Sequence, residues 1–263
     1  MTAIQIDLSG QTALVTGGTQ GIGRGIAQAF LRAGAKVVVC GRRAVAEPVS
    51  AAGRTAEFRA CDVRDAEAAT ALINGVAAEH EGLHILVNNA GGGPRVESAS
   101  ASRALTEKLV QLNLLAPFYL SQAAYSIMSA QPRGGSIINI ASVSAVRSSP
   151  YSAMYGAAKA GLLNLTQSLA MEWGPKIRVN AIIAGLVATE NSRAHYGGDA
   201  GIARVGAMLP LKRMGAPADI ANACLYLASP LAAYVSGAHL AVHGGGETPL
   251  FLDLAKSRES EIS

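Results

Sequence analysis

Residues 12–23 read TALVTGGTQGIG, an apolar run that passes directly into a glycine-rich turn. The run at residues 12–16 predicts a buried strand, and residues 21–33 predict a helix with Ile22 and Ile26 on one face. A glycine-rich turn between a strand and a helix lets the backbone approach a pyrophosphate, which the helix's free amides and positive dipole end attract. The stretch therefore predicts the phosphate-binding turn of a dinucleotide-binding fold.

The alternation of strand and helix continues along the chain. Further strands are predicted at residues 36–40, 56–61, 84–88, 136–142, 177–182 and 238–242, and further helices at residues 65–79, 102–128, 152–173 and 217–228. The helix at 102–128 is expected to kink at Pro117, because proline lacks an N–H. The alternation predicts an α/β fold, a single-domain, Rossmann-like, doubly wound parallel sheet of about seven strands with helices on both faces. No linker divides the pattern, so residues 1–263 are expected to form one domain with a frayed tail after about 250.

The composition excludes several classes of protein. Half of the 263 residues are hydrophobic and 15% are charged, which excludes intrinsic disorder as the main state. No apolar run approaches the ~18 residues of a membrane span, and the first residues do not resemble a secretory signal. The net charge is +4 without a run of Lys or Arg, so neither nucleic acid nor membrane is an expected partner. The three widely spaced cysteines predict reduced thiols and a cytoplasmic protein.

Several motifs follow one another at characteristic intervals. The turn has glycines at 17, 21 and 23, in the pattern TGxxxGxG, and residues 88–91 read NNAG after the fourth predicted strand. Tyr155 and Lys159 form a YxxxK motif, and Ser142 lies thirteen residues before that tyrosine. Together these motifs resemble the short-chain dehydrogenase/reductase family over about residues 8–246. No single motif carries the resemblance, whereas their order and spacing are highly specific.

The resemblance implies a set of site residues. The catalytic residues it implies are Asn113, Ser142, Tyr155 and Lys159. The implied cofactor-binding residues, with the two arginines discussed below, are Gly17, Thr19, Gln20, Gly21, Ile22, Gly23, Arg42, Arg43, Asp62, Val63, Asn89, Ala90, Gly91, Tyr155, Lys159, Gly185, Val187 and Thr189. The family also implies a mobile substrate lid at about residues 190–209 and assembly into a homotetramer or homodimer.

The chemistry of the tyrosine and lysine supports a catalytic role. Tyr155 and Lys159 are four residues apart in a predicted helix and therefore share a face. A free tyrosine has a pKa of about 10, and a nearby ammonium is expected to lower it toward neutrality, which makes Tyr155 a general acid or base. Ser142 ends a strand and can donate to a substrate carbonyl, while the resemblance implies that Asn113 anchors a water relaying protons to Lys159. The alternative interpretation is an accidental pair on a solvated helix, and Tyr151 is a rival tyrosine without a lysine four residues later.

The residues after the second strand favour one cofactor. An NAD enzyme usually places an acidic residue here to accept from the ribose 2′-OH, but this chain has Gly41 followed by Arg42 and Arg43. An arginine can pair with a 2′-phosphate, so NADP(H) is favoured over NAD(H). The alternative is that both arginines are solvated, and Gln20 departs from the basic residue that many NADP-using relatives carry.

One motif indicates a different chemistry. Residues 80–84 read HEGLH, which matches the zinc protease pattern, but that chemistry needs both histidines on one continuous helix. Gly82 is expected to end the helix, so His80 and His84 should diverge and no metal is expected. The chain also departs from the family in having Ala184 where a proline is usual, and His243 where an aspartate is usual.

The sequence therefore predicts an NADP(H)-dependent oxidoreductase that interconverts a carbonyl and a secondary alcohol, with Tyr155 as general acid/base. The substrate is an open choice among 3-oxoacyl thioesters, sugars, steroids and small cyclic alcohols, because the fold does not distinguish them. The main alternative is a catalytically silent dinucleotide-binding regulator of the same fold. A zinc hydrolase is a third hypothesis.

Overall fold

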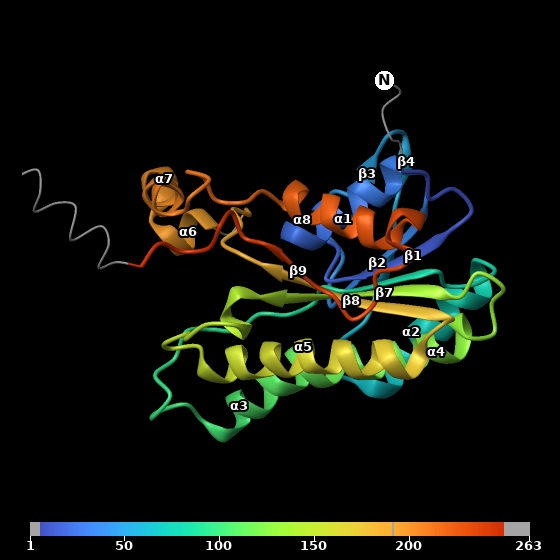
Figure 1. Ribbon diagram of the computed structural model, residues 1–263, viewed down its shortest axis with the longest axis horizontal. Helices are drawn as coiled ribbons and strands as arrows, with labels where there is room; N and C mark the ends of the chain where they lie inside the picture. The colour runs from blue at the N-terminus through green and yellow to red at the C-terminus, as the bar shows by residue number, and fades with distance from the viewer. Residues whose placement is uncertain (1–5, 191, 250–263) are drawn as a thin grey trace, which may run out of the picture.

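The computed structural model describes residues 6–190 and 192–249, in which one parallel sheet of seven strands is central (Figure 1). Its strand order is β5-β2-β1-β6-β7-β8-β9, so the chain builds outward from β1 on one side and then returns to β6 on the other. This reversal leaves a crevice at the carboxyl ends of β1 and β6, where open α/β sheets bind ligands. The strands are β1 (Thr12–Thr16), β2 (Lys36–Gly41), β5 (Glu57–Ala60), β6 (Ile85–Asn88), β7 (Gly135–Ser142), β8 (Ile177–Ala184) and β9 (His239–Val242).

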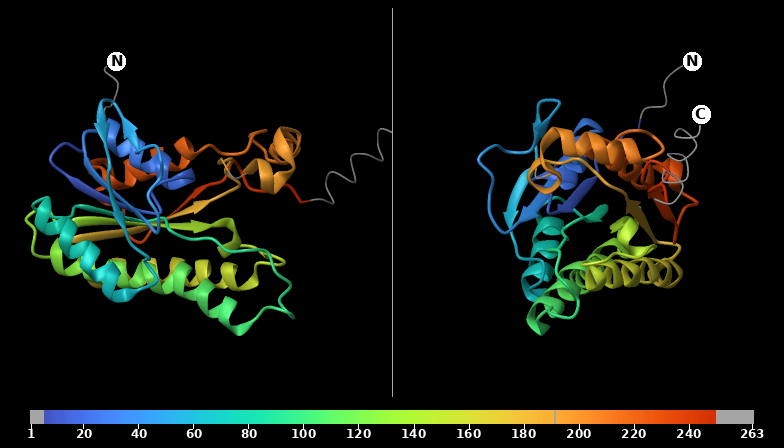
Figure 2. Two further views of the ribbon diagram at one scale, coloured as in Figure 1. Left: turned by 180° about the vertical axis from the view of Figure 1, so that it is seen from behind. Right: turned by 90° about the vertical axis from the view of Figure 1, so that its left-hand side faces the viewer.

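Helices cover both faces of the sheet, as the two views of Figure 2 show. One face carries α1 (Gly21–Arg32) and α8 (Pro217–Ala228), and the other carries α2 (Ala66–Glu79), α4 (Ala116–Met128) and α5 (Ala153–Trp173). The predicted fold class is confirmed.

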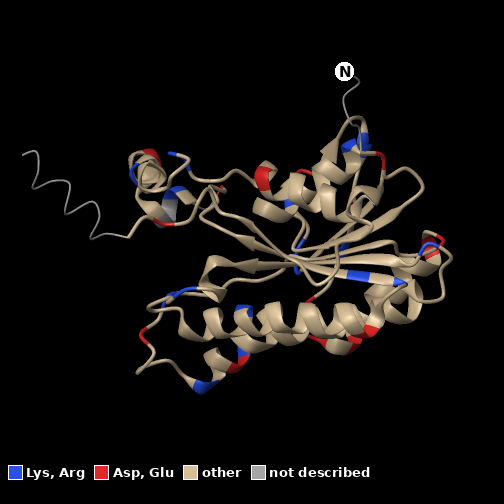
Figure 3. Ribbon diagram, viewed as in Figure 1, with Lys and Arg blue, Asp and Glu red and all other residues tan. Residues whose placement is uncertain are grey.

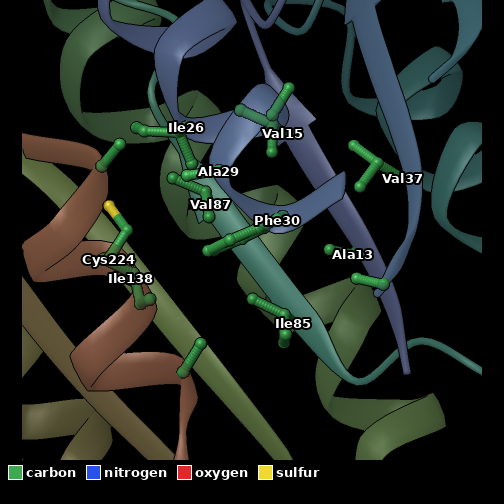
Figure 4. Close-up of a cluster of buried hydrophobic side chains, with 14 of the residues drawn as sticks. Ala13, Val15, Ile26, Ala29, Phe30, Val37, Ile85, Val87, Ile138 and Cys224 are labelled. Carbon is green, nitrogen blue, oxygen red and sulfur yellow. The ribbon is translucent and has the colours of Figure 1, made fainter. Parts of the chain in front are cut away.

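The central strands β1 and β6 to β8 are mainly apolar because both of their faces are buried, whereas the edge strands β5 and β9 are partly exposed. Within β1, Val15 packs in the cluster beneath α1 and α8, while Leu14 points into the second cluster on the opposite face. In the first cluster, Phe30 and Ile26 from α1 lie beside Val87 of β6 (Figure 4). Burial on both faces explains why the strands read as continuous apolar runs without alternation.

The long helix predicted at residues 102–128 is interrupted. It consists of α3 (Arg103–Val110), a single π-helical turn (Gln111–Leu115) and α4. The interruption therefore precedes Pro117, and the prediction of a kink at the proline is wrong by about one turn. Pro117 lies in the first turn of α4, directly after the π-helical turn.

Smaller elements were not predicted. A two-stranded hairpin, β3 (Ser50–Ala51) and β4 (Arg54–Thr55), precedes β5, and the segment predicted as a lid contains α6 (Ser192–Tyr196) and α7 (Gly198–Met208). The predicted frayed tail after residue 250 lies outside the described residues. No helix among the described residues is long and apolar enough to cross a membrane. Charged residues are scattered over loops, helices and strands in Figure 3.

Candidate active site

A cleft of about 800 Å³ crosses the carboxyl edge of the sheet at the point where the strand order reverses. The structure brings together here all of the predicted cofactor-binding residues except Val187. Ser142, at the end of β7, lines the same cleft. We call this space the cofactor cleft. Its walls also include Cys40, Ala44, Val45 and Leu112, which have no motif and were not predicted.

The glycines of the phosphate loop are required by close backbone packing. A Cβ atom on Gly23 would lie 2.3 Å from the Gly17 carbonyl oxygen and 2.5 Å from Nδ2 of Asn89. Gly17 and Gly21 also adopt positive φ angles of +62° and +53°, which favour glycine. Asn89 holds the loop from the next strand, because its Nδ2 donates to the Thr16 carbonyl at 2.8 Å. This backbone cradle at the start of α1 fits a dinucleotide pyrophosphate.

Lys159 and Tyr155 lie on one face of α5, as predicted from their spacing. The Lys159 side chain is 2% exposed, and its Nζ donates to the carbonyl of Ile140 at 2.7 Å. Burial lowers the pKa of Lys159 to about 8. Its Nζ lies 6.0 Å from the centre of the Tyr155 ring.

The pKa of Tyr155 differs from the prediction. Burial raises it above the usual value for tyrosine, and a hydrogen bond with the Ser142 side chain offsets only part of that effect. The expectation that Lys159 lowers this pKa toward neutrality is wrong for this structure. Desolvation disfavours the phenolate more strongly than the neighbouring polar groups favour it.

The Asn113 side chain contacts the site through its hydrogen bonds with the backbone of Gly92. It is fully buried in the π-helical turn, and its Oδ1 accepts from the amide of Gly92 at 2.8 Å. Its Nδ2 donates to the carbonyls of Gly92 at 3.0 Å and Leu109 at 2.9 Å. A Cβ atom on Gly91 would lie 2.8 Å from Asn113 Oδ1 and 3.2 Å from Lys159 Nζ, so Gly91 is the spacer between these two side chains.

Charged residues line the far end of the cofactor cleft. Asp62 accepts from the backbone amide of Arg64 at 3.1 Å and from its Nε at 2.9 Å, and these bonds lower the pKa of the carboxyl group. Arg42 and Arg43 are exposed on the cleft wall, and neither forms an ion pair with a described residue. Two unpaired guanidinium groups are suited to an anionic ligand.

Two sequence features lie away from the cleft. Val187 forms a bridge with Gly215 and lines a separate cavity of about 310 Å³, together with His243. Because the bridge turns Val187 toward that cavity, its predicted contact with the cofactor stays a prediction. The zinc-like motif is split as expected: His80 caps the end of α2 and pairs with Glu57, whereas His84 accepts from the amide of Thr12 at 3.1 Å.

Glu190, which the structure places at the phosphate loop, was not predicted from any motif. Its carboxylate accepts from the amide of Gly21 at 3.0 Å. A pair 169 residues apart has no spacing rule that a sequence pattern could reveal.

The fold and the cleft define a dinucleotide-dependent oxidoreductase of the Rossmann type, and comparison with known proteins agrees. A family model described as enoyl-(acyl carrier protein) reductase matches residues 17–247. The chain therefore belongs to the short-chain dehydrogenase/reductase family, as an NAD(P)-dependent enzyme acting on carbonyl and alcohol groups.

Three relatives illustrate the family. The chain is 36% identical over 254 residues to L-rhamnose 1-dehydrogenase (NAD(P)(+)) of Azotobacter vinelandii, covering 93% of this chain and 98% of the relative. It is 38% identical over 251 residues to 3alpha-hydroxysteroid dehydrogenase of Mediterraneibacter gnavus, covering 92% and 98%. A Beutenbergia cavernae protein assigned as an NAD(P)-dependent gluconate 5-dehydrogenase, solved with NADP at low occupancy, superposes with a TM-score of 0.84 at 36% identity, covering 92% and 98%.

Proposed function

We propose that this enzyme interconverts a secondary alcohol and a carbonyl with NADP(H), using Tyr155 as the general acid/base. The observation that carries the proposal is the meeting of Ser142, Tyr155 and Lys159 with the phosphate loop in one cleft. The described chain acts in this proposal as one domain that binds cofactor and substrate together.

The residues divide the chemistry between them. The nicotinamide cofactor supplies or accepts the hydride. The Tyr155 hydroxyl gives its proton to the carbonyl oxygen in reduction and takes it back in oxidation. The Ser142 hydroxyl donates a hydrogen bond to the same oxygen as negative charge develops there. Lys159 favours the phenolate form of Tyr155 against the burial that disfavours it, and Asn113 holds the backbone of Gly92 against the π-helical turn.

The raised pKa of Tyr155 keeps its side chain protonated, which fits a proton donor better than a phenolate base. A neutral phenol at physiological pH is ready to protonate a carbonyl, which is the reductive direction. In the oxidative direction, the ammonium of Lys159 must offset the burial of the phenolate.

The substrate class that the relatives support is a hydroxyl or carbonyl carried on a sugar or sugar-acid skeleton. Relatives named for L-rhamnose and 2-dehydro-3-deoxy-D-gluconate match most of this chain, and a steroid dehydrogenase is the second candidate. Turnover of aldoses, aldonates and hydroxysteroids, followed at the nicotinamide absorbance with each cofactor, tests this. Dinucleotide binding without turnover on the whole panel would instead favour the silent regulator.

The preference for NADP(H) rests on Arg42 beside Gly41. A guanidinium without a carboxylate partner can bind a 2′-phosphate, which NAD lacks. Replacing Arg42→Ala is expected to weaken NADPH binding by roughly ten-fold or more and to leave NADH binding nearly unchanged. Arg103→Ala, which removes an exposed arginine at the start of α3, is the control. Equal losses for both dinucleotides in Arg42→Ala would contradict the preference.

We further propose a homotetramer or homodimer in the cytoplasm. Large apolar side chains are exposed at Met171 near the end of α5, and at Leu231 and Tyr234 after α8, which suits burial between subunits. All three cysteines are unpaired and buried, which suits a reducing compartment. Light scattering coupled to gel filtration measures the assembly directly.

A further inference from the structure

The first turn of α1 receives a carboxylate from a distant part of the chain. Helix α1 begins at Gly21 after the N-cap Gln20, whose side chain makes no capping hydrogen bond, and its first turn contains no acidic residue. Instead, the Gly21 amide donates to Oε2 of Glu190 at 3.0 Å. The phosphate loop therefore holds an anionic group that the protein itself supplies.

Glu190 is held in this position by the turn that carries it. The Thr189 amide donates to Oγ of Ser192 at 2.7 Å, and the Ser192 amide donates back to the Thr189 carbonyl at 2.9 Å. Ser192 is 5% exposed, so this reciprocal pair is shielded from water. The Thr189 side chain would also lie 3.3 Å from a Cβ atom on Gly21. The turn and the phosphate loop thus pack against each other around the Glu190 contact.

The Glu190 carboxylate has no cationic partner there. None of the ion pairs formed within the described ranges includes it, and the residue is exposed. A free amide and the positive end of a helix dipole stabilise a carboxylate in such a place. A dinucleotide pyrophosphate uses the same amides and the same dipole. Two anions within a few ångströms repel each other, so the two groups compete.

We propose that Glu190 is a cofactor-displacing carboxylate, which binds the phosphate loop in the free enzyme and must leave it when a pyrophosphate-bearing dinucleotide binds. This inference rests on the proposed cofactor site. Glu190 lowers the affinity for the dinucleotide and speeds its release. Because Glu190 precedes α6 and α7, its withdrawal also transmits cofactor binding to the segment predicted as the substrate lid.

Calorimetric titration separates the charge of Glu190 from its role as a cap. Glu190→Gln keeps a hydrogen-bond acceptor without the charge, and Glu190→Ala removes both. We expect both variants to bind NADP⁺ and inorganic pyrophosphate roughly three- to ten-fold more tightly than the wild type. Binding of adenosine, which has no phosphate, should not change. Glu107→Gln removes one exposed carboxylate from α3, outside the cofactor cleft, and should leave every affinity unchanged.

The outcomes distinguish failure of this inference from failure of the proposed function. Unchanged or weaker NADP⁺ binding in Glu190→Gln overturns the inference, because the charge would then not oppose the cofactor. If neither variant bound the dinucleotide more tightly and only Glu190→Ala had a lower melting temperature, Glu190 would act only as a cap of helix α1. A wild type that binds neither NADP⁺ nor NAD⁺ would instead overturn the proposed cofactor function. Hydrogen exchange at residues 192–208 should rise on adding NADP⁺ to the wild type, and should change less in Glu190→Ala.

Discussion

Two long helical segments on the same face of the sheet carry three of the four proposed catalytic residues, and they differ in regularity. Helix α5 runs unbroken from Ala153 to Trp173, so Tyr155 and Lys159 stand one turn apart on one face. The segment that contains Asn113 is broken by the π-helical turn between α3 and α4. A regular helix can present two side chains at a fixed spacing, but it uses every backbone carbonyl internally. A π-helical turn interrupts that regular pattern of backbone bonds, and such turns are frequent at functional sites.

Two residues, Asn113 and Pro117, explain the break between α3 and α4. The Asn113 side chain donates to the carbonyl of Leu109, one turn earlier, and so competes with the helical pattern. In an α-helix, the amide of residue 117 would donate to the Asn113 carbonyl, and Pro117 has no amide hydrogen. Pro117 therefore cannot donate to the Asn113 carbonyl, although the irregular turn lies before the proline and not at it.

The largest expected effect comes from removing the hydroxyl that the regular helix presents. We expect Tyr155→Phe to lower kcat by roughly a thousand-fold, because a positioned acid/base contributes about 10²–10⁴-fold. NADPH affinity should change little, since the phosphate loop is untouched. Steady-state turnover and calorimetry measure the two quantities separately.

The matched control for that change is Tyr234→Phe, which removes the same hydroxyl from a fully exposed ring after α8. It should retain full turnover. If Tyr155→Phe kept more than about a tenth of the wild-type kcat, Tyr155 would not be the general acid/base.

The buried ammonium on the same regular helix predicts a pH-dependent stability. Burial lowers the pKa of Lys159 to about 8, while an unfolded lysine titrates near 10.5. Between these values the unfolded state holds the proton and the folded state does not, so stability rises with pH. From pH 8 to 10 the free energy of unfolding should rise by about 2 to 3 kcal/mol relative to Lys159→Met.

Urea unfolding of both proteins at pH 7, 8, 9 and 10 measures this difference. Below pH 8 both states are protonated, and the difference should be flat. The raised pKa of Tyr155 acts in the opposite direction only above about pH 10, because the unfolded tyrosine then ionises first. A difference that stays constant, or that falls between pH 8 and 10, would contradict the burial of a titrating ammonium.

The contrast between the regular helix α5 and the irregular segment around Asn113 also explains what could be predicted from the sequence. The parallel sheet follows from short apolar runs that alternate with helical segments, and the pairing of Tyr155 with Lys159 follows from the helical period of 3.6; the structure contains both. The phosphate loop was predictable because its glycines stand at a strand–helix junction. Each of these features depends on residues that are close together in the chain.

The features that were missed depend on groups brought together by the fold. The π-helical turn depends on the bonds of Asn113 with a loop about twenty residues earlier. The contact of Glu190 with Gly21 joins residues that are 169 positions apart in the chain. The pKa of Tyr155 depends on burial, which a motif does not report. Sequence spacing therefore predicted which side chains meet in the cleft, but not the electrostatics and the backbone geometry around them.

The smallest expected effect tests the irregular segment alone. Pro117→Ala restores an amide that can donate to the Asn113 carbonyl and make the helix more regular around Asn113. We expect kcat to fall by roughly two- to five-fold and KM to stay the same, with a stability change below about 1 kcal/mol. Pro230→Ala, which replaces a proline at the start of another short helix, should change neither kinetic constant. Wild-type turnover in Pro117→Ala, across pH 6 to 9, would mean that the missing amide at residue 117 has no role in catalysis and that the break serves only to place the Asn113 side chain.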